Sequence, residues 1–337
     1  MTLLDDTVAR IVPADAQAAA SAQLALDAKT KPRGSLGRLE ELAVRIAAIR
    51  RAPRPGRLEA AIVVAAADHG VAAEGVSAYP AEVTGQMLAN FEAGGAAVCV
   101  LARIAAARLH VVDVGVGRPT GNIARGAAMT TGDARTLVEQ GVACVRELGD
   151  EGVGIVGLGE MGIGNSTVAA ALAAALLGVD AERVCGRGTG IDEEGLQRKI
   201  RVVRAALAAN RVERGDTLAV LAALGGSELA FLCGVALGAA AEQLVVVLDG
   251  FISSVAALVA ARLAPAAAQA MIAAHLSPEP GHRLVLDELG LEPLLDLSLR
   301  LGEGSGAALC LPLVDAALAV LDEMATFETA GVTDAGR

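Results

Sequence analysis

Six apolar runs rich in valine, isoleucine, leucine and alanine alternate along the chain with segments of helical character. Runs of this kind are typical of strands that are buried on both faces, as in a parallel sheet. The runs are "AIVVAAADHG", "LHVVDVGVG", "GVGIVGLGE", "LAVLAALGGSE", "LVVVLDGF" and "MIAAHLSPE", and the helical segments are 81–106, 118–148, 164–178, 192–209, 227–241 and 252–263. This alternation predicts an α/β fold with a doubly wound, mostly parallel six-stranded sheet.

Every one of these runs ends in polar or glycine residues. The polar ends are Asp68-His69, Asp113, Glu160, Ser227-Glu228, Asp249 and His275-Ser277. In open α/β sheets, ligands bind beyond the carboxyl ends of the strands. We therefore expect the polar groups to converge on one edge of the sheet, with about half of them serving as helix caps or supporting groups.

The two ends of the chain differ from the middle because they show helical patterning and no strand run. Residues 58–282 are expected to form a large Rossmann-like α/β domain with the substrate site. Residues 1–57 and 283–337 are expected to pack together as a small helical domain that carries the loop around Glu303.

The composition excludes several classes of function. The 337 residues carry a net charge of −11 and only 1% are aromatic, which disfavours nucleic-acid and membrane-surface binding. The longest uncharged runs are shorter than the roughly 20 apolar residues that a membrane helix needs. The acidic start lacks the basic region of a secretory signal, and the five cysteines form no C-x-x-C pair, so a cytoplasmic protein is expected. The four histidines lack metal-ligand spacing, and no metal or cofactor is predicted.

Gly157, Gly159 and Gly162 form a literal G-x-G-x-x-G that follows a predicted strand and precedes a helix. A dinucleotide site would also need an acidic residue roughly 20 residues further on, at the end of the next strand. The acidic candidates, Asp180 and Glu182, lie in a turn instead. The dinucleotide interpretation is therefore disfavoured.

A single phosphate group fits this loop better, because it leads into a helix whose first N–H groups are unpaired. The residues at that helix start are Gly162, Gly164, Asn165 and Ser166. A second glycine loop, "CGRGTGID", carries Arg187, Thr189 and Gly190, and Lys199 lies on the helix that follows. The sequence thus predicts a mononucleotide phosphate site, although Arg187 and Lys199 taken alone are better interpreted as solvated surface charges.

Glu303 lies between two glycines, directly before a predicted helix. The glycines allow the backbone to approach a ligand closely and leave the carboxylate uncrowded. Such a carboxylate could accept a proton from a weakly acidic N–H nucleophile. It could equally be an acid that is favoured at a helix start by the helix dipole.

Six long motifs, in this order, carry a resemblance to a known family. They are "KPRGSLGRLEELA" (31–43), "AADHGVAAEGVSAYPAEVTGQMLANFEAGGAAVCVLAR" (66–103), "GEMGIGNSTVAAAL" (159–172), "GRGTGID" (186–192), "HLSPEPGH" (275–282) and "LRLGEGSGAAL" (299–309). From about residue 24 to 327, the chain resembles the nicotinate-nucleotide:dimethylbenzimidazole phosphoribosyltransferases of cobalamin biosynthesis. The resemblance implies transfer of the 5-phosphoribosyl group of nicotinate mononucleotide to dimethylbenzimidazole, giving nicotinate and α-ribazole 5′-phosphate. It also implies a homodimer.

The resemblance implies roles for individual residues. Glu303 matches the general base, and Glu160 matches a second acidic residue that orients the ribose or stabilises the electron-poor sugar. The residues that match nucleotide and phosphate contacts are Gly162, Ile163, Gly164, Asn165, Thr189, Gly190, Lys199 and Ser277. The residues expected at the benzimidazole pocket are Ser77, Tyr79, Gln86, Met161 and Leu301.

This reaction suits the residues, because a nicotinate cation leaves without protonation and only one base is needed for the incoming N–H. Two alternatives stay open at this point. One is an NAD-dependent oxidoreductase that uses the Gly157, Gly159 and Gly162 loop, and the other is a non-catalytic nucleotide sensor. The acceptor base, which could be dimethylbenzimidazole, adenine or a phenolic ring, is also undecided.

Overall fold

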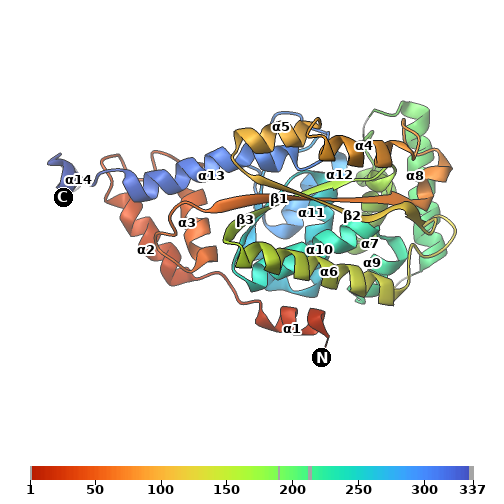
Figure 1. Ribbon diagram of the computed structural model, residues 1–337, viewed down its shortest axis with the longest axis horizontal. Coiled ribbons are helices and arrows are strands. Elements are labelled where there is room, and N and C mark those ends of the chain that lie inside the picture. Colours follow the sequence, from red (N-terminus) through yellow and green to blue (C-terminus); the bar gives the residue numbers. More distant parts are fainter. Residues whose placement is uncertain (1, 189, 212–214, 334–337) are drawn as a thin grey trace.

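The computed structural model describes residues 2–188, 190–211 and 215–333. These residues form a five-stranded parallel sheet in the order β2-β1-β3-β4-β5, with helices on both faces (Figure 1). The strands are β1 (Glu59–His69), β2 (Arg108–Thr120), β3 (Val153–Met161), β4 (Val245–Leu248) and β5 (Met271–Ala273). The predicted doubly wound α/β fold is therefore confirmed. The winding direction reverses between β1 and β3, the place where such sheets bind ligands.

The helices cover the sheet and extend from it. They are α1 (Leu3–Arg10), α2 (Ala16–Asp27), α3 (Arg38–Arg50), α4 (Val83–Glu92), α5 (Ala97–Ile104), α6 (Thr131–Asp150), α7 (Asn165–Leu177), α8 (Glu193–Asn210), α9 (Thr217–Leu224), α10 (Ser227–Ala241), α11 (Phe251–Leu263), α12 (Pro280–Leu289), α13 (Ser305–Glu323) and α14 (Phe327–Ala330). Short 3₁₀ helices occupy Gly70–Glu74, Ala181–Arg183 and Pro265–Ala270. Helices α6 and α10 lie on one face of the sheet, and α4, α5 and α13 lie on the other (Figure 1).

The central strands form where β-branched residues run together. Ile62, Val63 and Val64 of β1 are fully buried, because helices cover both faces of the strand. Side chains of this kind pack well on a pleated surface and lose little freedom there. The continuous apolar run is thus explained by two-sided burial.

One of the six predicted strands is wrong, since "LAVLAALGGSE" forms helix α9 and the start of α10. Val220 is the one β-branched residue in the run, and the leucines and alanines around it favour a helix. Asp216 caps the helix by accepting a hydrogen bond from the N–H of Ala219 at 3.0 Å. The sheet therefore has five strands rather than six.

Two predicted helical segments are shorter than expected. Residues 118–120 continue β2, and helix α6 begins only after the capping box formed by Thr130 and Asp133. The segment 81–106 is divided into α4 and α5 at Gly94, which has φ +72°. Both differences arise from local capping and turn chemistry.

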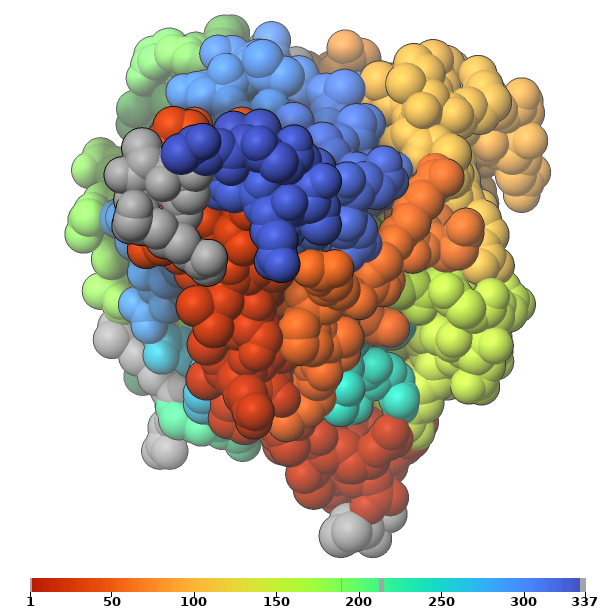
Figure 2. Space-filling view, turned by 90° about the vertical axis from the view of Figure 1, so that its left-hand side faces the viewer, coloured from red at the N-terminus to blue at the C-terminus, as the bar shows by residue number. Residues whose placement is uncertain are grey.

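The two ends of the chain pack together. Helices α2 and α3 lie against α13, and Lys29 forms an isolated antiparallel bridge with Thr326. Figure 2 shows the N-terminal segments, in red and orange, side by side with the blue C-terminal segment. Helix α1 instead packs on α6 and α10, and α12 packs on α11. The division into a large domain (58–282) and a small helical domain (1–57 with 283–337) stays a prediction.

Two helical stretches are long and apolar enough to cross a membrane by length and composition alone. The first, Ser305–Glu323, is α13, whose most apolar stretch is 56% buried within the protein. The second, Val83–Ile104, comprises α4 and α5 and is interrupted between them. A core helix passes the same test, so these stretches are weak evidence for a membrane protein.

Candidate active site

A cleft with a volume of about 100 Å³ opens at the carboxyl edge of the sheet, close to the reversal in winding direction. Its lining combines the first glycine loop, the starts of α7 and α11, the loop after β5 and the segment before α13. The lining residues are Glu160, Met161, Gly162, Ile163, Asn165, Ser166, Gly188, Gly250, Phe251, Ile252, His275, Ser277, Glu279, Leu299, Arg300, Leu301 and Gly302.

Glu160 lies at the end of β3 and is buried. Its Oε2 accepts a hydrogen bond from Nδ2 of Asn165 at 2.5 Å. Burial raises the pKa of Glu160 to about 8, and the nearby Asp249 carboxylate adds to the shift. This side chain is therefore mostly protonated at neutral pH, so it can donate a hydrogen bond to a ligand as well as accept one.

Glu303 is held in an unusual backbone conformation directly before α13. Its φ is +65°, and the glycines on either side, Gly302 and Gly304, have φ +83° and +89°. A left-handed conformation costs a non-glycine residue of the order of 1 kcal/mol, and such strain is typical of functional sites. Burial raises the pKa of Glu303, and the charge of Asp249 raises it further. The N–H of Val98, 3.4 Å from Oε2, lowers this pKa and so offsets part of the shift. A raised pKa makes this carboxylate a better proton acceptor.

Two glycines bring Glu160 and Glu303 together. A Cβ on Gly302 would overlap Oε1 of Glu160, and a Cβ on Gly159 would overlap the carbonyl oxygen of Glu303. The absence of side chains at these positions lets the loop before α13 lie directly on β3. The two carboxyl groups that were predicted separately thus belong to one site.

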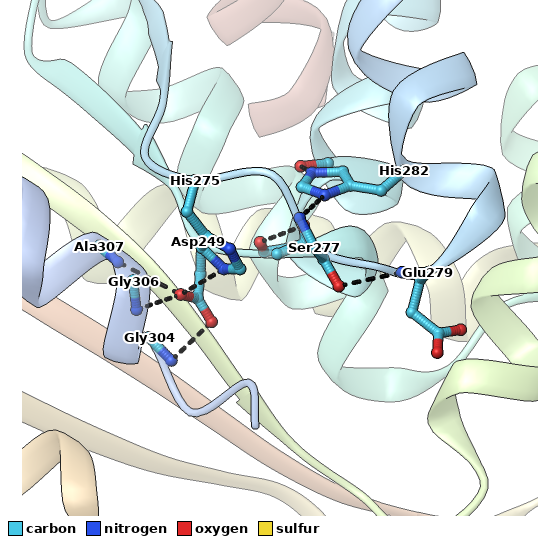
Figure 3. A network of polar contacts seen from close by, with 11 residues as sticks. Asp249, His275, Ser277, Glu279, His282, Gly304, Gly306 and Ala307 are labelled. Atoms are coloured by element: carbon cyan, nitrogen blue, oxygen red, sulfur yellow. Dashed lines mark hydrogen bonds and ion pairs between the residues drawn. The ribbon is translucent and has the colours of Figure 1, made fainter. Parts of the chain in front are cut away.

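Asp249 anchors the Glu303 loop, a role that the sequence analysis missed. It ends the fifth apolar run, and its carboxylate accepts N–H bonds from Gly304 (3.1 Å), Gly306 (2.6 Å) and Ala307 (3.2 Å) (Figure 3). His275 Nε2 lies 3.7 Å from its Oδ1. Burial raises the pKa of Asp249, whereas His275 and the three N–H donors oppose that shift. A carboxylate that satisfies the start of α13 fixes the position of Glu303.

The G-x-G-x-x-G motif divides into structural and ligand-facing glycines. Gly157 lies within β3, where an added Cβ would stand 3.1 Å from Cβ of Ala307. Gly159 also faces the α13 side, as described above. Of the three glycines, only Gly162 lines the cleft. The pattern therefore reflects close packing of α13 on the sheet more than recognition of a pyrophosphate.

Lys199 projects from α8 and is 1% exposed. Its Nζ donates to Ser166 Oγ at 3.0 Å and to the carbonyl oxygen of Gly186 at 3.1 Å. Burial lowers the pKa of Lys199, and the charge of Glu279 opposes that shift. None of the ion pairs in the described part of the chain includes Lys199. A buried ammonium beside the N-terminus of α7 makes this end of the cleft suitable for an anion.

Ser277 is positioned by a buried histidine. The N–H of Ser277 donates to Nδ1 of His282 at 2.9 Å, and Nε2 of His282 lies 3.1 Å from Ser254 Oγ (Figure 3). Because Nδ1 accepts, the ring proton belongs on Nε2 and is donated to Ser254. Burial, with His275 and Arg283 nearby, lowers the pKa of His282 to about 3.

The neutral state of His282 makes stability depend on pH. The folded ring stays unprotonated until about pH 3, whereas in the unfolded chain it takes up a proton near pH 6.5. The stability that this difference contributes is complete above pH 6.5 and is lost as pH falls toward 3. Between pH 7 and 4.5, the unfolding free energy should therefore fall about 2 kcal/mol more for the native protein than for His282→Gln. Urea unfolding followed by circular dichroism would measure the unfolding free energy of both proteins at each pH. An equal decrease with pH in the two proteins would contradict the prediction.

The residues predicted in the second glycine loop differ in where they lie relative to the cleft. Arg187 does not line the cleft but lines a neighbouring pocket with Gly188 and Glu279, and its half-exposed guanidinium pairs with Glu193 at 2.6 Å. Gly190 has φ +122° and lies near Arg300. Thr189 lies outside the described residues. Of the two basic residues predicted here, Lys199 binds Ser166, which lines the cleft, whereas the guanidinium of Arg187 pairs with the exposed Glu193.

The residues predicted at the base pocket form two groups. Met161 and Leu301 line the cleft. Ser77, Tyr79 and Gln86 belong to a neighbouring segment in which Tyr79 is 52% exposed. This segment is joined to the glycine loop, because the N–H of Ile163 donates to Thr84 Oγ1 at 3.1 Å. The segment thus lies beside the glycine loop, but Ser77, Tyr79 and Gln86 do not line the cleft.

A buried pair behind the loop was also missed. His69 Nε2 lies 2.9 Å from Glu228 Oε1, and both side chains are fully buried. A Cβ on Gly162 would stand 2.8 Å from His69 Nε2, so the imidazole supports the back of the glycine loop. Both residues end apolar runs in the sequence, which is a signal for the edge of the sheet but not for this pairing.

Comparisons with known proteins agree with this geometry. A model of the DBI_PRT phosphoribosyltransferase family matches residues 11–332. Nicotinate-nucleotide--dimethylbenzimidazole phosphoribosyltransferases from Chloroflexus aggregans and Roseiflexus sp. are 50% and 51% identical to the chain, each over 99% of both sequences. The crystal structure of CobT from Thermus thermophilus superposes with a TM-score of 0.91 at 48% identity, covering 94% of this chain and 99% of that one. The chain therefore belongs to the DBI_PRT phosphoribosyltransferase family and is a transferase enzyme.

Proposed function

We propose that this phosphoribosyltransferase moves the 5-phosphoribosyl group of nicotinate mononucleotide to dimethylbenzimidazole, in assembly of the nucleotide loop of cobalamin. The observation that carries the proposal is that the lining of one cleft adjoins both a carboxylate base and an anion site. Gly302, which lines the cleft, precedes the proposed base Glu303, and Ser166, which also lines it, accepts a hydrogen bond from Lys199 at the start of α7. The relatives described above bear the name of this activity.

The phosphate group is the handle that positions the sugar. In this proposal Lys199 and Ser166 bind phosphate oxygens, together with the N–H groups at the start of α7. Gly162, Ile163, Gly164 and Asn165 shape the loop, and Ser277 faces it across the cleft. Fixing the ribose in this way converts the attack of the base into an intramolecular event.

The chemical step then needs only one proton acceptor. The nitrogen of dimethylbenzimidazole attacks the anomeric carbon as the bond to the nicotinate ring nitrogen breaks, and the electrons of that bond neutralise the pyridinium. The N–H proton of dimethylbenzimidazole passes to Glu303. Glu160, held by Asn165 and mostly protonated, is proposed to orient the ribose rather than to carry charge.

The test is to mix the protein with nicotinate mononucleotide and dimethylbenzimidazole and to follow products by chromatography and mass. Nicotinate and ribazole phosphate should form in equal amounts. Parallel reactions with adenine and a phenolic ring would rank the acceptors, since these differ by a few contacts near Met161 and Leu301. Bound nicotinate mononucleotide without product from any acceptor would favour the sensor instead. The oxidoreductase is disfavoured by the packing roles of Gly157 and Gly159.

We propose that the enzyme acts as a homodimer in the cytoplasm. An apolar face on α5 supports the dimer, because Val100 is 43% exposed and Ile104 is 74% exposed beside the edge strand β2. All five cysteines are free and four are buried, which agrees with a reducing compartment.

Ile104→Glu should shift the protein from dimer to monomer, because the new charge would have to be desolvated at the contact. Size-exclusion chromatography with light scattering would measure the mass at several concentrations. Leu24→Glu is a matched control, since Leu24 is 70% exposed on α2 and lies on another surface. A mass that stays dimeric in Ile104→Glu would contradict the α5 contact, and a monomeric native protein would contradict the dimer.

A further inference from the structure

Glu279 is a carboxylate that the proposed reaction does not use, yet it lines the substrate cleft. It lies in the loop between β5 and α12, two residues after Ser277 (Figure 3). Its Oε1 accepts a hydrogen bond from the N–H of Gly188 at 2.8 Å. Its Oε2 is buried and has no hydrogen-bond partner within the described ranges. A negative group that is only half satisfied thus faces a site for an anion.

The same short loop joins Glu279 to the proposed phosphate site. Lys199 Nζ donates to the carbonyl oxygen of Gly186, and the carboxylate of Glu279 packs against Cα of that same glycine. A Cβ on Gly188 would stand 3.1 Å from Ser166 Oγ and 3.8 Å from Lys199 Nζ. The Gly188 N–H therefore belongs to the group of donors that surrounds the phosphate position.

We propose that Glu279 competes with the phosphate group of the substrate and weakens its binding. The inference rests on the phosphate site of the proposed function. A carboxylate and a phosphate oxygen both require an N–H donor, and one Gly188 N–H cannot fully serve both. The fixed negative charge of Glu279 also repels a phosphate dianion that is bound beside Lys199.

Weak binding of the 5′-phosphate favours turnover, because the substrate and the product both carry this phosphate and the product must be released. Every contact to the 5′-phosphate stabilises nicotinate mononucleotide and ribazole phosphate equally, so it does not accelerate the chemical step by itself. A site that held phosphate too tightly would release product slowly, and product release limits many enzymes. Glu279 offsets part of the attraction of Lys199 and the α7 N-terminus.

The other interpretation is that Glu279 only clamps the glycine loop. The two predict opposite signs, since loss of a clamp weakens phosphate binding and loss of a competitor strengthens it. Arg300 helps to separate them, because its guanidinium donates to the carbonyl oxygen of Gly188 at 3.2 Å. The loop thus keeps its hydrogen bonds from Arg300 and Lys199 when Glu279 is replaced.

The experiment measures inhibition of the native enzyme and two variants by inorganic phosphate, with nicotinate mononucleotide as the varied substrate, at pH 6.5. Glu279→Gln removes the charge and retains an acceptor for Gly188, whereas Glu279→Ala removes both. In at least one variant the inhibition constant for phosphate and the KM for nicotinate mononucleotide should each fall about three- to tenfold. Glu288→Gln is the matched control, because Glu288 is exposed on α12 and pairs with Arg262 at 2.8 Å, and it should leave both constants unchanged.

The outcomes separate the inference from the proposed function. If inorganic phosphate does not compete with nicotinate mononucleotide in the native enzyme, the proposed phosphate site itself is wrong. If it competes, but neither folded variant binds phosphate more tightly, the phosphate site stands and the competing role of Glu279 is overturned. Circular dichroism and the Tm of each variant establish that it is folded before the constants are compared.

Discussion

Replacing Glu303 by glutamine should lower kcat about a thousandfold, the middle of the range for loss of a general base. Glutamine keeps the size of the side chain and can still accept the N–H of Val98, but it cannot take up the proton of dimethylbenzimidazole. The KM for nicotinate mononucleotide should change little, because the phosphate is proposed to bind at Lys199 and Ser166, whereas the Glu303 carboxylate bonds to the N–H of Val98. Steady-state kinetics with both substrates would provide these values.

The backbone of Glu303 supplies a control. Its φ of +65° is easy for glycine and costly for other residues, so Glu303→Gly should fold at least as well as the native protein. Neither Glu303→Gly nor Glu303→Gln should be able to remove the proton of dimethylbenzimidazole. If Glu303→Gly were as inactive as Glu303→Gln, the defect would belong to the side chain. Turnover near the native rate in Glu303→Gln would exclude this carboxylate as the base.

The general location of the site could be predicted from the sequence because polar strand ends in a parallel sheet necessarily meet. Glu160 and Asp249 end β3 and β4, which pair directly, and His275 follows β5. The meeting of these polar residues at one edge could therefore be predicted from two things alone. These are the order of the apolar runs and the rule that ligands bind at the carboxyl ends of parallel strands. Glu303 was harder to place, since it follows no strand and reaches the site through packing of α13 on Gly157 and Gly159.

What could not be predicted depends on side chains that meet across the chain. Asp249 accepts hydrogen bonds from the N–H groups of Gly304, Gly306 and Ala307, and His69 pairs with Glu228 more than 150 residues away. No local pattern encodes such pairs. For Arg187 a phosphate contact stays a prediction, because its position in a glycine loop suggested one, whereas its guanidinium pairs with Glu193. The missing strand has a similar cause, since an apolar run of seven to eleven residues suits a buried helix as well as a strand.

Lys199→Met should raise the KM for nicotinate mononucleotide about a hundredfold, because a charge-assisted hydrogen bond to a phosphate contributes roughly 1.5–3 kcal/mol. Methionine follows a similar path through the core but carries no charge. The kcat should fall far less than in Glu303→Gln, since the lysine binds the phosphate in substrate and transition state alike. Inorganic phosphate should also cease to inhibit.

The stability of the same variant distinguishes a ligand site from a structural lysine. Removing Lys199 leaves the buried carbonyl oxygen of Gly186 without this hydrogen bond, which destabilises the protein. It also removes the desolvation cost of an almost fully buried ammonium, which stabilises the protein. These effects have opposite signs, so the free energy of unfolding should change by no more than about 1 kcal/mol. A purely structural lysine would show the reverse pattern, with a large loss of stability and an unchanged KM. A natural chain bears the cost of burying an unpaired ammonium when an anionic ligand supplies the missing charge, and the KM of Lys199→Met measures that contribution directly.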